Sequence, residues 1–245
     1  MEKKYDIILV NFYFTTINDF GSTRHYDFMN YLARKYKILI ITSKNHHLSR
    51  NTSNPVNKTF DIIKIDNPKY NNNISRLFSI LYFCLRLFFD YRYQLKNSKF
   101  IIATSPDLIV PSFTIFISKI YNIKRFLEVR DVWPLTLLSQ KDISKINPIY
   151  FLFSFLERYI YKNSNLIFSN LKFFNLRLNE LKIQKKFIYL PDLINFKKIN
   201  NDKGKLNLIY CGTENKSNNF NIIYDFIKKI SKNLNNISIY IFLYN

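Results

Sequence analysis

The sequence predicts an α/β protein: a doubly wound parallel sheet with helices on both faces, plus one βαβ unit of an incomplete second domain. Short runs rich in β-branched and aromatic residues alternate with longer segments of helical periodicity along most of the chain. Several short runs are apolar at nearly every position, as in strands buried on both faces. The polar segment 195–205 interrupts this alternation. We therefore expect an amino-terminal domain over residues 1–198, and a linker with one βαβ unit over residues 199–245.

The first half of the chain is expected to hold four strands and two long helices. Apolar residues recur at helical spacing from Phe28 to Tyr36, and Ser22 or Thr23 can cap the start of that helix. The second helix is assigned because its apolar run is too long for a strand. The expected strands cover residues 5–12, 37–42, 59–66 and 99–103, and the expected helices cover residues 22–36 and 73–97.

The second half continues the alternation. Residues 105–122 have a helical pattern with a kink or a late start at Pro111, because a proline inside a helix removes a hydrogen bond. Further helices are expected at residues 148–162, 171–182 and 219–234, and further strands at residues 125–129, 165–168, 187–190, 206–211 and 237–243.

Glycine is scarce, since the 245 residues contain only Gly21, Gly204 and Gly212. A dinucleotide-binding GxGxxG loop, a phosphate-binding P-loop, a kinase glycine loop and a GxSxG nucleophile elbow all need clustered glycines. The sequence therefore excludes each of these four kinds of site.

The chain is strongly basic, with 37 Lys and Arg against 17 Asp and Glu and a formal charge of +20. An A/T-rich genome is one explanation, because Lys, Asn, Ile, Phe and Tyr are all abundant. Attraction to an anionic membrane, a nucleic acid or a phosphorylated substrate is the other. The basic residues are spread along the chain without a dense tract, so we expect no dedicated nucleic-acid-binding tail.

The segment 73–97 is unusually apolar, with only a narrow polar stripe. Burial against a sheet is the ordinary interpretation, and Cys84 is then a buried thiol. Alternatively one face rests in a membrane interface, and the two interpretations can coexist on different faces. Its longest apolar stretch is too short to span a bilayer, and no signal-peptide cleavage site follows the first strand. We expect a cytoplasmic protein, with peripheral contact to the inner membrane face as the option that this helix leaves open.

Two loops at expected carboxyl ends of strands carry candidate binding residues, because ligands of open α/β sheets bind at that edge. In the first loop, Gly21 permits a turn or a close backbone approach, and the helix start at Ser22 offers free N–H groups to an anion. Arg24 adds a positive charge, and His25 beside it is a further candidate contact. The alternative is an ordinary βα turn with a capped helix.

The second loop, EVRDVWP at residues 128–134, combines two carboxylates, an arginine and the only tryptophan. Arg130 can clamp a phosphate or carboxylate, while Glu128 or Asp131 orients it or bonds sugar hydroxyls. Trp133 can stack on a ring or serve as a hydrophobic lid. The alternative is a structural ion pair within the loop.

No metal site is expected. His25 has no partner at metal-ligand spacing, and His46 and His47 are assigned to a solvated loop. No two aspartates stand at positions i and i+2, which excludes a DxD site.

The order of these pieces resembles glycosyltransferase family 4, specifically the amino-terminal, acceptor-side domain of its GT-B fold. The stretch EVRDVWP is the most specific match and is similar to bacterial members that build O-antigen and capsule repeat units. The resemblance covers roughly residues 1–212. The other matching pieces are Gly21-Ser22 with Arg24, Ser105-Pro106, LERYIYKNSNLIFS at 156–169, YLPD at 189–192 and LIYCGT at 208–213.

The resemblance implies sugar transfer from a nucleotide-sugar donor, with retention and without a metal or other cofactor. It also implies a lipid-linked glycan acceptor in surface-polysaccharide synthesis, and contact with an anionic membrane through basic and apolar surface. Gly21 and its neighbours are then expected to face the donor phosphates. Arg130 and Asp131 are expected to line the acceptor and the reaction centre, and they are the catalytic candidates.

The chain departs from the family pattern in its last part. The family's Glu-x7-Glu element is absent, since no two glutamates are eight positions apart. We therefore expect a truncated donor-side domain and little or no transferase activity of the chain alone. The alternative is a non-catalytic, acceptor-binding subunit that pairs with a separate donor-domain chain. A nucleic-acid-binding protein is a third interpretation, motivated only by charge.

Overall fold

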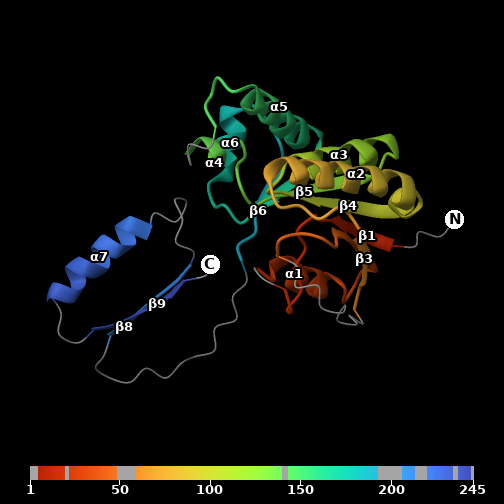
Figure 1. Cartoon of the computed structure of the whole chain (residues 1–245). Coiled ribbons are helices and arrows are strands. Elements are labelled where there is room, and N and C mark those ends of the chain that lie inside the picture. Colours follow the sequence, from red (N-terminus) through yellow and green to blue (C-terminus); the bar gives the residue numbers. More distant parts are fainter. Residues whose placement is uncertain are drawn as a thin grey trace. The chain divides into compact units, whose positions relative to one another are not determined.

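The computed structural model describes two compact units. The described residues are 5–19, 22–48, 59–139, 143–192, 206–212, 220–233 and 237–243. Unit 1 comprises Met1–Leu138 and Ile143–Leu193, and unit 2 comprises Ser139–Asp142 and Ile194–Asn245. Figure 1 shows the elements of both units in sequence colours.

Unit 1 is built on a seven-stranded parallel sheet with the strand order β3-β2-β1-β4-β5-β6-β7. The register places Ile8 of β1 between Leu39 of β2 and Ile101 of β4, so the most buried strands lie at the centre of the sheet. The predicted α/β class with a parallel, doubly wound sheet is confirmed. The strands are β1 (Tyr5–Val10), β2 (Ile38–Ser43), β3 (Asp61–Ile65), β4 (Ser98–Thr104), β5 (Lys124–Val129), β6 (Leu166–Ser169) and β7 (Phe187–Tyr189).

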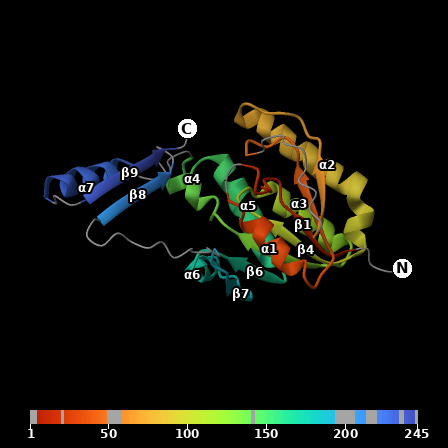
Figure 2. The same ribbon diagram turned by 90° about the horizontal axis from the view of Figure 1, so that it is seen from below.

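Helices cover both faces of this sheet. Figures 1 and 2 show α1 (Arg24–Leu32) on one face and later helices of unit 1 on the other. The second face carries α2 (Asn73–Lys96), α3 (Ile109–Ile120), α5 (Pro148–Asn163) and α6 (Phe174–Glu180). The short helix α4 (Leu135–Ser139), which the sequence did not predict, follows β5.

The strand order reverses between β1 and β4. The chain passes from β1 to β2 on one side, and from β3 across to β4 on the other. The loops after β1 and β4 therefore leave the sheet toward opposite faces. The carboxyl ends of the strands at such a switch point are where open α/β sheets bind their ligands.

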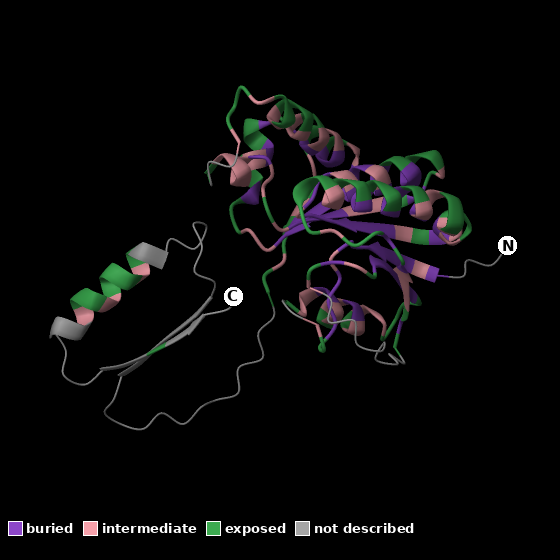
Figure 3. Cartoon of the chain, in the orientation of Figure 1, coloured by how far each residue is buried: buried purple, intermediate pink, exposed green. Residues whose placement is uncertain are grey.

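Helix α2 buries one of its two apolar faces. Ile80, Phe83, Cys84 and Leu87 recur at helical spacing and are buried against the sheet. The rings of Phe83 and Phe12 meet edge to face with centroids 5.2 Å apart. Cys84 is a buried free thiol as predicted, and burial raises its pKa. The opposite face of α2 is apolar as well, but it is exposed (Figure 3).

Several helix boundaries differ from those that the sequence predicts. Helix α3 has the predicted late start, at Ile109, which places Pro111 in the first turn, where its missing N–H disrupts no helical hydrogen bond. The carboxylate of Asp107 accepts hydrogen bonds from the N–H groups of Ile109 and Val110, at 3.0 and 2.8 Å, and so caps this start. Helix α1 ends at Leu32 rather than at residue 36. Backbone N–H groups after Leu32 bond to carbonyls three residues earlier, as in a tighter 3₁₀ turn.

The described residues 206–212, 220–233 and 237–243 of unit 2 form a βαβ unit, as the sequence predicts. Its strands β8 (Leu206–Gly212) and β9 (Ile237–Leu243) pair in parallel, with Leu206 opposite Ile237. Helix α7 (Phe220–Asn233) connects them. A parallel pair needs such a crossover, because a short hairpin reverses the strand direction.

The orientation of α2 can be tested with two leucines on the same helix. Leu87 is 0% exposed and Leu85 is 53% exposed. We expect Leu87→Ala to lower the free energy of unfolding by about 2–5 kcal/mol, because it leaves a cavity in the core. Leu85→Ala is expected to change it by less than about 0.5 kcal/mol. Urea unfolding followed by circular dichroism measures both values, and equal losses would contradict this orientation of α2.

Candidate functional site

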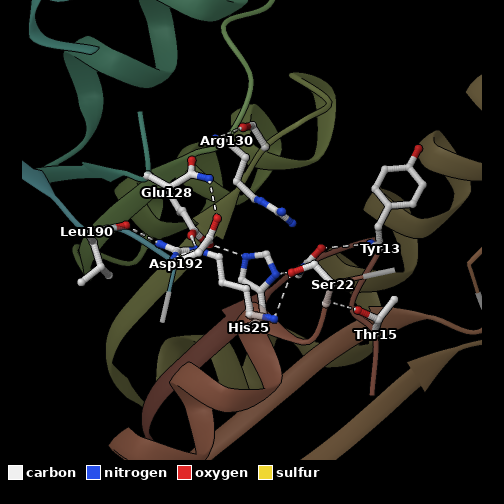
Figure 4. A network of polar contacts seen from close by, with 12 residues as sticks. Tyr13, Thr15, Ser22, His25, Glu128, Arg130, Leu190 and Asp192 are labelled. Carbon is white, nitrogen blue, oxygen red and sulfur yellow. Dashed lines mark hydrogen bonds and ion pairs between the residues drawn. The ribbon is translucent and has the colours of Figure 1, made fainter. Parts of the chain in front are cut away.

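A buried carboxylate, Glu128, organises the carboxyl edge of the sheet. Glu128 is 1% exposed and lies one residue before the end of β5. Its Oε1 accepts a hydrogen bond from Nε of Arg24 at 2.8 Å, and its Oε2 lies 2.5 Å from Nε2 of His25. Both partners belong to the first turn of α1 (Figure 4). The two loops that the sequence singled out are therefore joined directly.

The alternation of side chains along β5 explains why Glu128 faces α1. Leu127 and Val129 are buried in the core on the face that carries α3, α5 and α6. Successive side chains of a strand point to opposite faces, so Glu128 projects toward the α1 side. Phe126, two residues earlier, packs in the core on that same side.

Arg24 connects this carboxylate to the chain that follows β7. Its Nη1 donates to the carbonyl of Pro191 at 2.9 Å and to Oδ1 of Asp192 at 2.7 Å, and its Nη2 donates to the carbonyl of Leu190 at 2.8 Å. With the bond to Glu128, four of the five guanidinium N–H groups have protein acceptors. In this structure Arg24 therefore joins three segments of unit 1.

The hydrogen bonds of His25 assign its tautomer. Oδ1 of Asn11 accepts the N–H of Tyr13 at 3.0 Å, which turns the Asn11 amide nitrogen toward Nδ1 of His25 at 3.1 Å. Because an amide nitrogen can only donate, Nδ1 is the acceptor. The ring proton then sits on Nε2 and is donated to Glu128. The ring is buried, so both of its nitrogens have partners inside the protein.

Glu128 is ionised throughout the physiological pH range. Burial by itself raises the pKa of a carboxyl group, but the contacts of Glu128 with His25 and Arg24 outweigh it and lower its pKa to about 2. The site thus holds one buried negative charge, surrounded by hydrogen-bond donors from α1.

Arg130 lies beside this network, held by its backbone. Oγ of Ser105 accepts the N–H of Arg130 at 2.8 Å, and the N–H of Ser105 bonds the carbonyl of Glu128 at 3.0 Å. Figure 4 shows the Arg130 side chain extending toward His25 and Ser22, at the start of α1. Among the described residues, no carboxylate lies within ion-pairing distance of its guanidinium. Arg130 therefore has a charge available for an anionic group.

The rest of the EVRDVWP loop divides into polar and apolar parts. Desolvation raises the pKa of Asp131, and the neighbouring positive charge of Arg130 opposes that rise. Trp133 is partly buried and packs on Phe153 of α5, with ring centroids 5.7 Å apart. The structure places Trp133 among apolar side chains, so its predicted stacking on a ligand ring stays a prediction.

The loop after β1 is held by hydrogen bonds of its own. The hydroxyl of Thr15 donates to the carbonyl of Ser22 at 2.6 Å, and Oγ of Ser22 accepts the N–H of Arg24 at 3.2 Å. Gly21 lies outside the described residues. The predicted contacts of Gly21, Ser22, Arg24 and His25 with a substrate stay predictions, and the structure adds protein partners for the last three.

A second cluster of polar and aromatic side chains lies at the same carboxyl edge of the sheet, beyond β1. The sequence assigned His46 to a solvated loop, but His46 is 7% exposed, so that prediction is wrong for it. Desolvation lowers its pKa to about 4, and the ring is therefore neutral. The ring of Tyr13 packs against His46 and His47, with centroids 6.2 and 5.4 Å away. His47 is exposed, as predicted.

The sequence missed two side chains of the Glu128 network. Asn11 lies at the end of an apolar strand run, and its carboxyl-edge position was the signal that could have identified it. Asp192 was noted only as part of YLPD, yet it binds Arg24 and also accepts a hydrogen bond from Asn170 at 3.2 Å. No local pattern connects Asp192 with a residue that lies 168 positions earlier.

Two surface hollows lie at the opposite, amino-terminal edge of the sheet. One of about 310 Å³ is lined by the start of β4 and β5, including Ser98 and Lys124. The other, of about 450 Å³, adjoins the start of β7 at Phe187. In the part of the chain that is described, no three His, Cys, Asp or Glu residues come together as candidate metal ligands.

Comparison with solved structures finds proteins of similar architecture. The chain is similar to Phytolacca americana UGT2 complexed with UDP-2fluoro-glucose and pterostilbene, with 11% sequence identity over 87% of this chain and 61% of that one, at a TM-score of 0.51. It is also similar to the glycotransferase of kitacinnamycin, with 9% identity over 97% of this chain and 65% of that one, at a TM-score of 0.53. No family model and no curated protein matches the sequence. The likeness shows a shared GT-B fold. This chain spans 61% and 65% of the lengths of the two neighbours.

Replacing the central carboxylate tests whether it stabilises unit 1. Glu128→Gln leaves Arg24 and His25 without their buried anion, so we expect the free energy of unfolding at neutral pH to fall by about 3 kcal/mol. Urea unfolding measures it. Asp90→Asn is the control, because Asp90 pairs with Arg86 in an exposed position and little change is expected there. An equal effect of both substitutions would contradict the structural role of Glu128.

The same variant tests the acid dependence of stability. Because the pKa of Glu128 is lowered from 4.5 to about 2 in the folded chain, its contribution is complete above pH 4.5 and is lost as the pH falls toward 2. We expect the stability difference between wild type and Glu128→Gln to shrink by about 3 kcal/mol over that range. Taking the difference removes the opposite effect of Asp107, whose pKa burial raises to about 6. A constant difference would refute the lowered pKa.

Proposed function

We propose that this chain is the acceptor-side part of a nucleotide-sugar-dependent glycosyltransferase of family 4 type. The proposed reaction transfers a sugar to a lipid-linked glycan in surface-polysaccharide synthesis. The observation that carries the proposal is the position of Arg130 and the Glu128 network at the carboxyl edge, beside the switch point of the sheet. The shared GT-B fold supports a nucleotide-sugar donor, since the Phytolacca enzyme was solved with a UDP-sugar analogue.

Arg130 is the proposed anion-binding residue. A lipid-linked glycan carries its sugar on a phosphate or diphosphate, and a guanidinium binds such oxygens with two parallel N–H donors. The side chain has no carboxylate partner among the described residues, and the bond from its N–H to Ser105 fixes its backbone. Asp131 beside it is suited to accept a hydrogen bond from a sugar hydroxyl.

Glu128, Arg24 and His25 act mainly as positioning residues in this proposal. Their bonds to one another hold the start of α1 against the end of β5. The N–H of Arg24 bonds Ser22, and the next N–H groups of the α1 start are thereby kept at the edge where the proposed phosphate binds. This is a preorganised arrangement, in which a ligand does not have to order the loop itself.

A second candidate function is a non-catalytic, acceptor-binding subunit that works with a separate donor-domain chain. The observation that favours it is that every described residue of the candidate site belongs to unit 1. Acceptor binding then requires none of the residues of unit 2. The two functions differ in one measurable property, which is transfer by the chain itself.

Arg130→Ala tests the proposed site. The purified chain is incubated with radiolabelled UDP-sugars and a detergent-solubilised polyprenyl-diphosphate glycan, and both lipid-bound label and glycan binding are measured. We expect Arg130→Ala to weaken the measured activity or binding by about 10- to 100-fold, because a charge-assisted hydrogen bond is lost. Arg34→Ala is the matched control, since Arg34 is exposed and follows α1 at the other edge of the sheet.

The outcomes separate the two functions. Label transfer by the chain itself supports the enzyme and contradicts the expectation that the chain alone has little or no activity. Saturable glycan binding without transfer supports an acceptor-binding chain. Absence of both from the wild-type chain, or an unchanged Arg130→Ala variant, contradicts the proposed site.

A further inference from the structure

Basic side chains gather at the amino-terminal edge of the sheet, opposite the candidate site. Along the sequence these residues are dispersed, but the strands of a parallel sheet all start at one edge, and the helices between them end there. Lys37 precedes β2, Lys124 begins β5 and Lys186 precedes β7, while Lys96 ends α2. The fold of unit 1 therefore concentrates part of the positive charge at this edge.

One of the two hollows at this edge is lined by basic residues from several elements. It has a volume of about 310 Å³, and Lys96, Lys99 and Lys124 are among its lining residues. The hollow lies where α2 and α3 end and where β4 and β5 begin. Helices α2 and α3 pack side by side, and β4 and β5 are paired strands (Figure 1). We call this site the amino-edge hollow.

Two of these lysines have no carboxylate that compensates their charge. Nζ of Lys99 lies 2.6 Å from Oδ1 of Asp6, and Oδ2 of Asp6 accepts the N–H of Lys37 at 2.9 Å. Both oxygens of that carboxylate are therefore engaged. Among the described residues, no carboxylate lies within ion-pairing distance of Lys96 or Lys124, and both residues are exposed. The described lining of the hollow thus has a net positive charge.

The last carbonyl groups of α2 have hydrogen-bond donors other than these lysines. Lysines near the end of a helix commonly bind its free carbonyls. Here Nδ2 of Asn97 donates to the carbonyl of Tyr93 at 2.9 Å, and Oγ of Ser98 donates to the carbonyl of Leu95 at 2.7 Å. The end of α2 is therefore capped by its own neighbours in sequence.

Helix α3 ends in a Schellman motif, which satisfies its carbonyls in the same way. Asn122 has a φ of 51°, in the left-handed region that asparagine tolerates. Its N–H bonds the carbonyl of Lys119 at 3.0 Å. The next N–H, of Ile123, bonds the carbonyl of Ser118 at 2.8 Å. The ammonium groups that line the hollow consequently remain available to a ligand.

We propose that the amino-edge hollow binds a compact polyphosphate anion, of the class of pyrophosphate and tripolyphosphate. A lysine ammonium binds phosphate oxygens as a point charge with three rotatable N–H donors. Lysines from α2, β4 and β5 can then contact successive phosphate groups of one anion. The inference goes beyond the proposed function and does not depend on it, because no lining residue of the hollow belongs to the Glu128 network or to the EVRDVWP loop.

The size and shape of the hollow select this occupant. Its volume is about ten times the roughly 30 Å³ that a water molecule occupies in the liquid, so it holds more than one phosphate group. Concave walls of low dielectric also focus the field of the lysines on a small anion. No described helix is long and apolar enough to cross a membrane, and a flat lipid surface meets convex protein surface rather than a hollow.

Isothermal titration calorimetry of the full chain with tripolyphosphate tests the proposal. We expect saturable binding that is tighter than the binding of inorganic phosphate and that salt weakens. The double variant Lys96→Gln/Lys124→Gln is expected to bind at least about tenfold more weakly, because two charged hydrogen-bond donors are lost. Pyrophosphate and ADP are compared as well, since ADP carries the same diphosphate on a nucleoside, and ADP is expected to bind no more tightly.

Lys69→Gln/Lys172→Gln is the matched control. It lowers the net charge by the same amount, but these exposed residues follow β3 and β6, at the carboxyl edge of the sheet. We expect it to bind tripolyphosphate almost as wild type does. Arg130→Ala is the second control, because the candidate site also offers a positive charge, and this variant is expected to retain the binding. Urea unfolding verifies that all variants are folded.

Four results would overturn the proposal. The first is no saturable binding by the wild-type chain. The second is binding that the Lys96→Gln/Lys124→Gln variant retains. The third is an equal loss in either control, which would indicate general attraction by charge or binding at the candidate site. The fourth is much tighter binding of ADP than of pyrophosphate, which would make the ligand a nucleotide instead of a free polyphosphate.

Discussion

The buried contact of Glu128 with Arg24 and His25, an ion pair with the first and a hydrogen bond with the second, is the interaction on which the carboxyl edge of unit 1 depends. A carboxylate removed from water loses several kcal/mol of hydration, and only well-placed donors offset that loss. The α1 start supplies such donors, and α1 is in turn held by the chain after β7. Strand β5, helix α1 and residues 190–192 therefore share one electrostatic centre.

The sequence was sufficient for most of the fold because the determining signals are local. Strand and helix periods alternate regularly, and a proline followed by helical spacing locates the late start of α3. The second helix was recognised but its environment was ambiguous, since residues such as Phe83 and Phe78 are equally apolar. Periodicity cannot decide which of two apolar faces meets the sheet. That decision follows from the β3-to-β4 crossover, which is a property of the whole sheet.

The sequence identified the two loops of the candidate site, but it did not identify which of their residues bond to each other. Arg24 and Arg130 received the same role from the sequence, as charges beside an anion. The structure separates them, because strand order brings Glu128 and Asp192 to Arg24 across 104 and 168 positions of sequence. His46 was misjudged for a related reason: a polar residue in a polar segment indicates exposure, yet the segment folds beneath the ring of Tyr13. Partners that distant leave no mark in a local pattern.

The hydrogen bonds from Arg24 to residues 190–192 also couple these two parts of unit 1 mechanically. Unit 1 ends at Leu193, directly after the carbonyls and the carboxylate that this guanidinium holds. The described part of unit 1 is therefore tied to Arg24 up to Asp192. A displacement of residues 190–192 would therefore also displace Arg24, and through it Glu128 and His25. The edge that presents Arg130 is for this reason mechanically coupled to the segment 190–192 that follows β7.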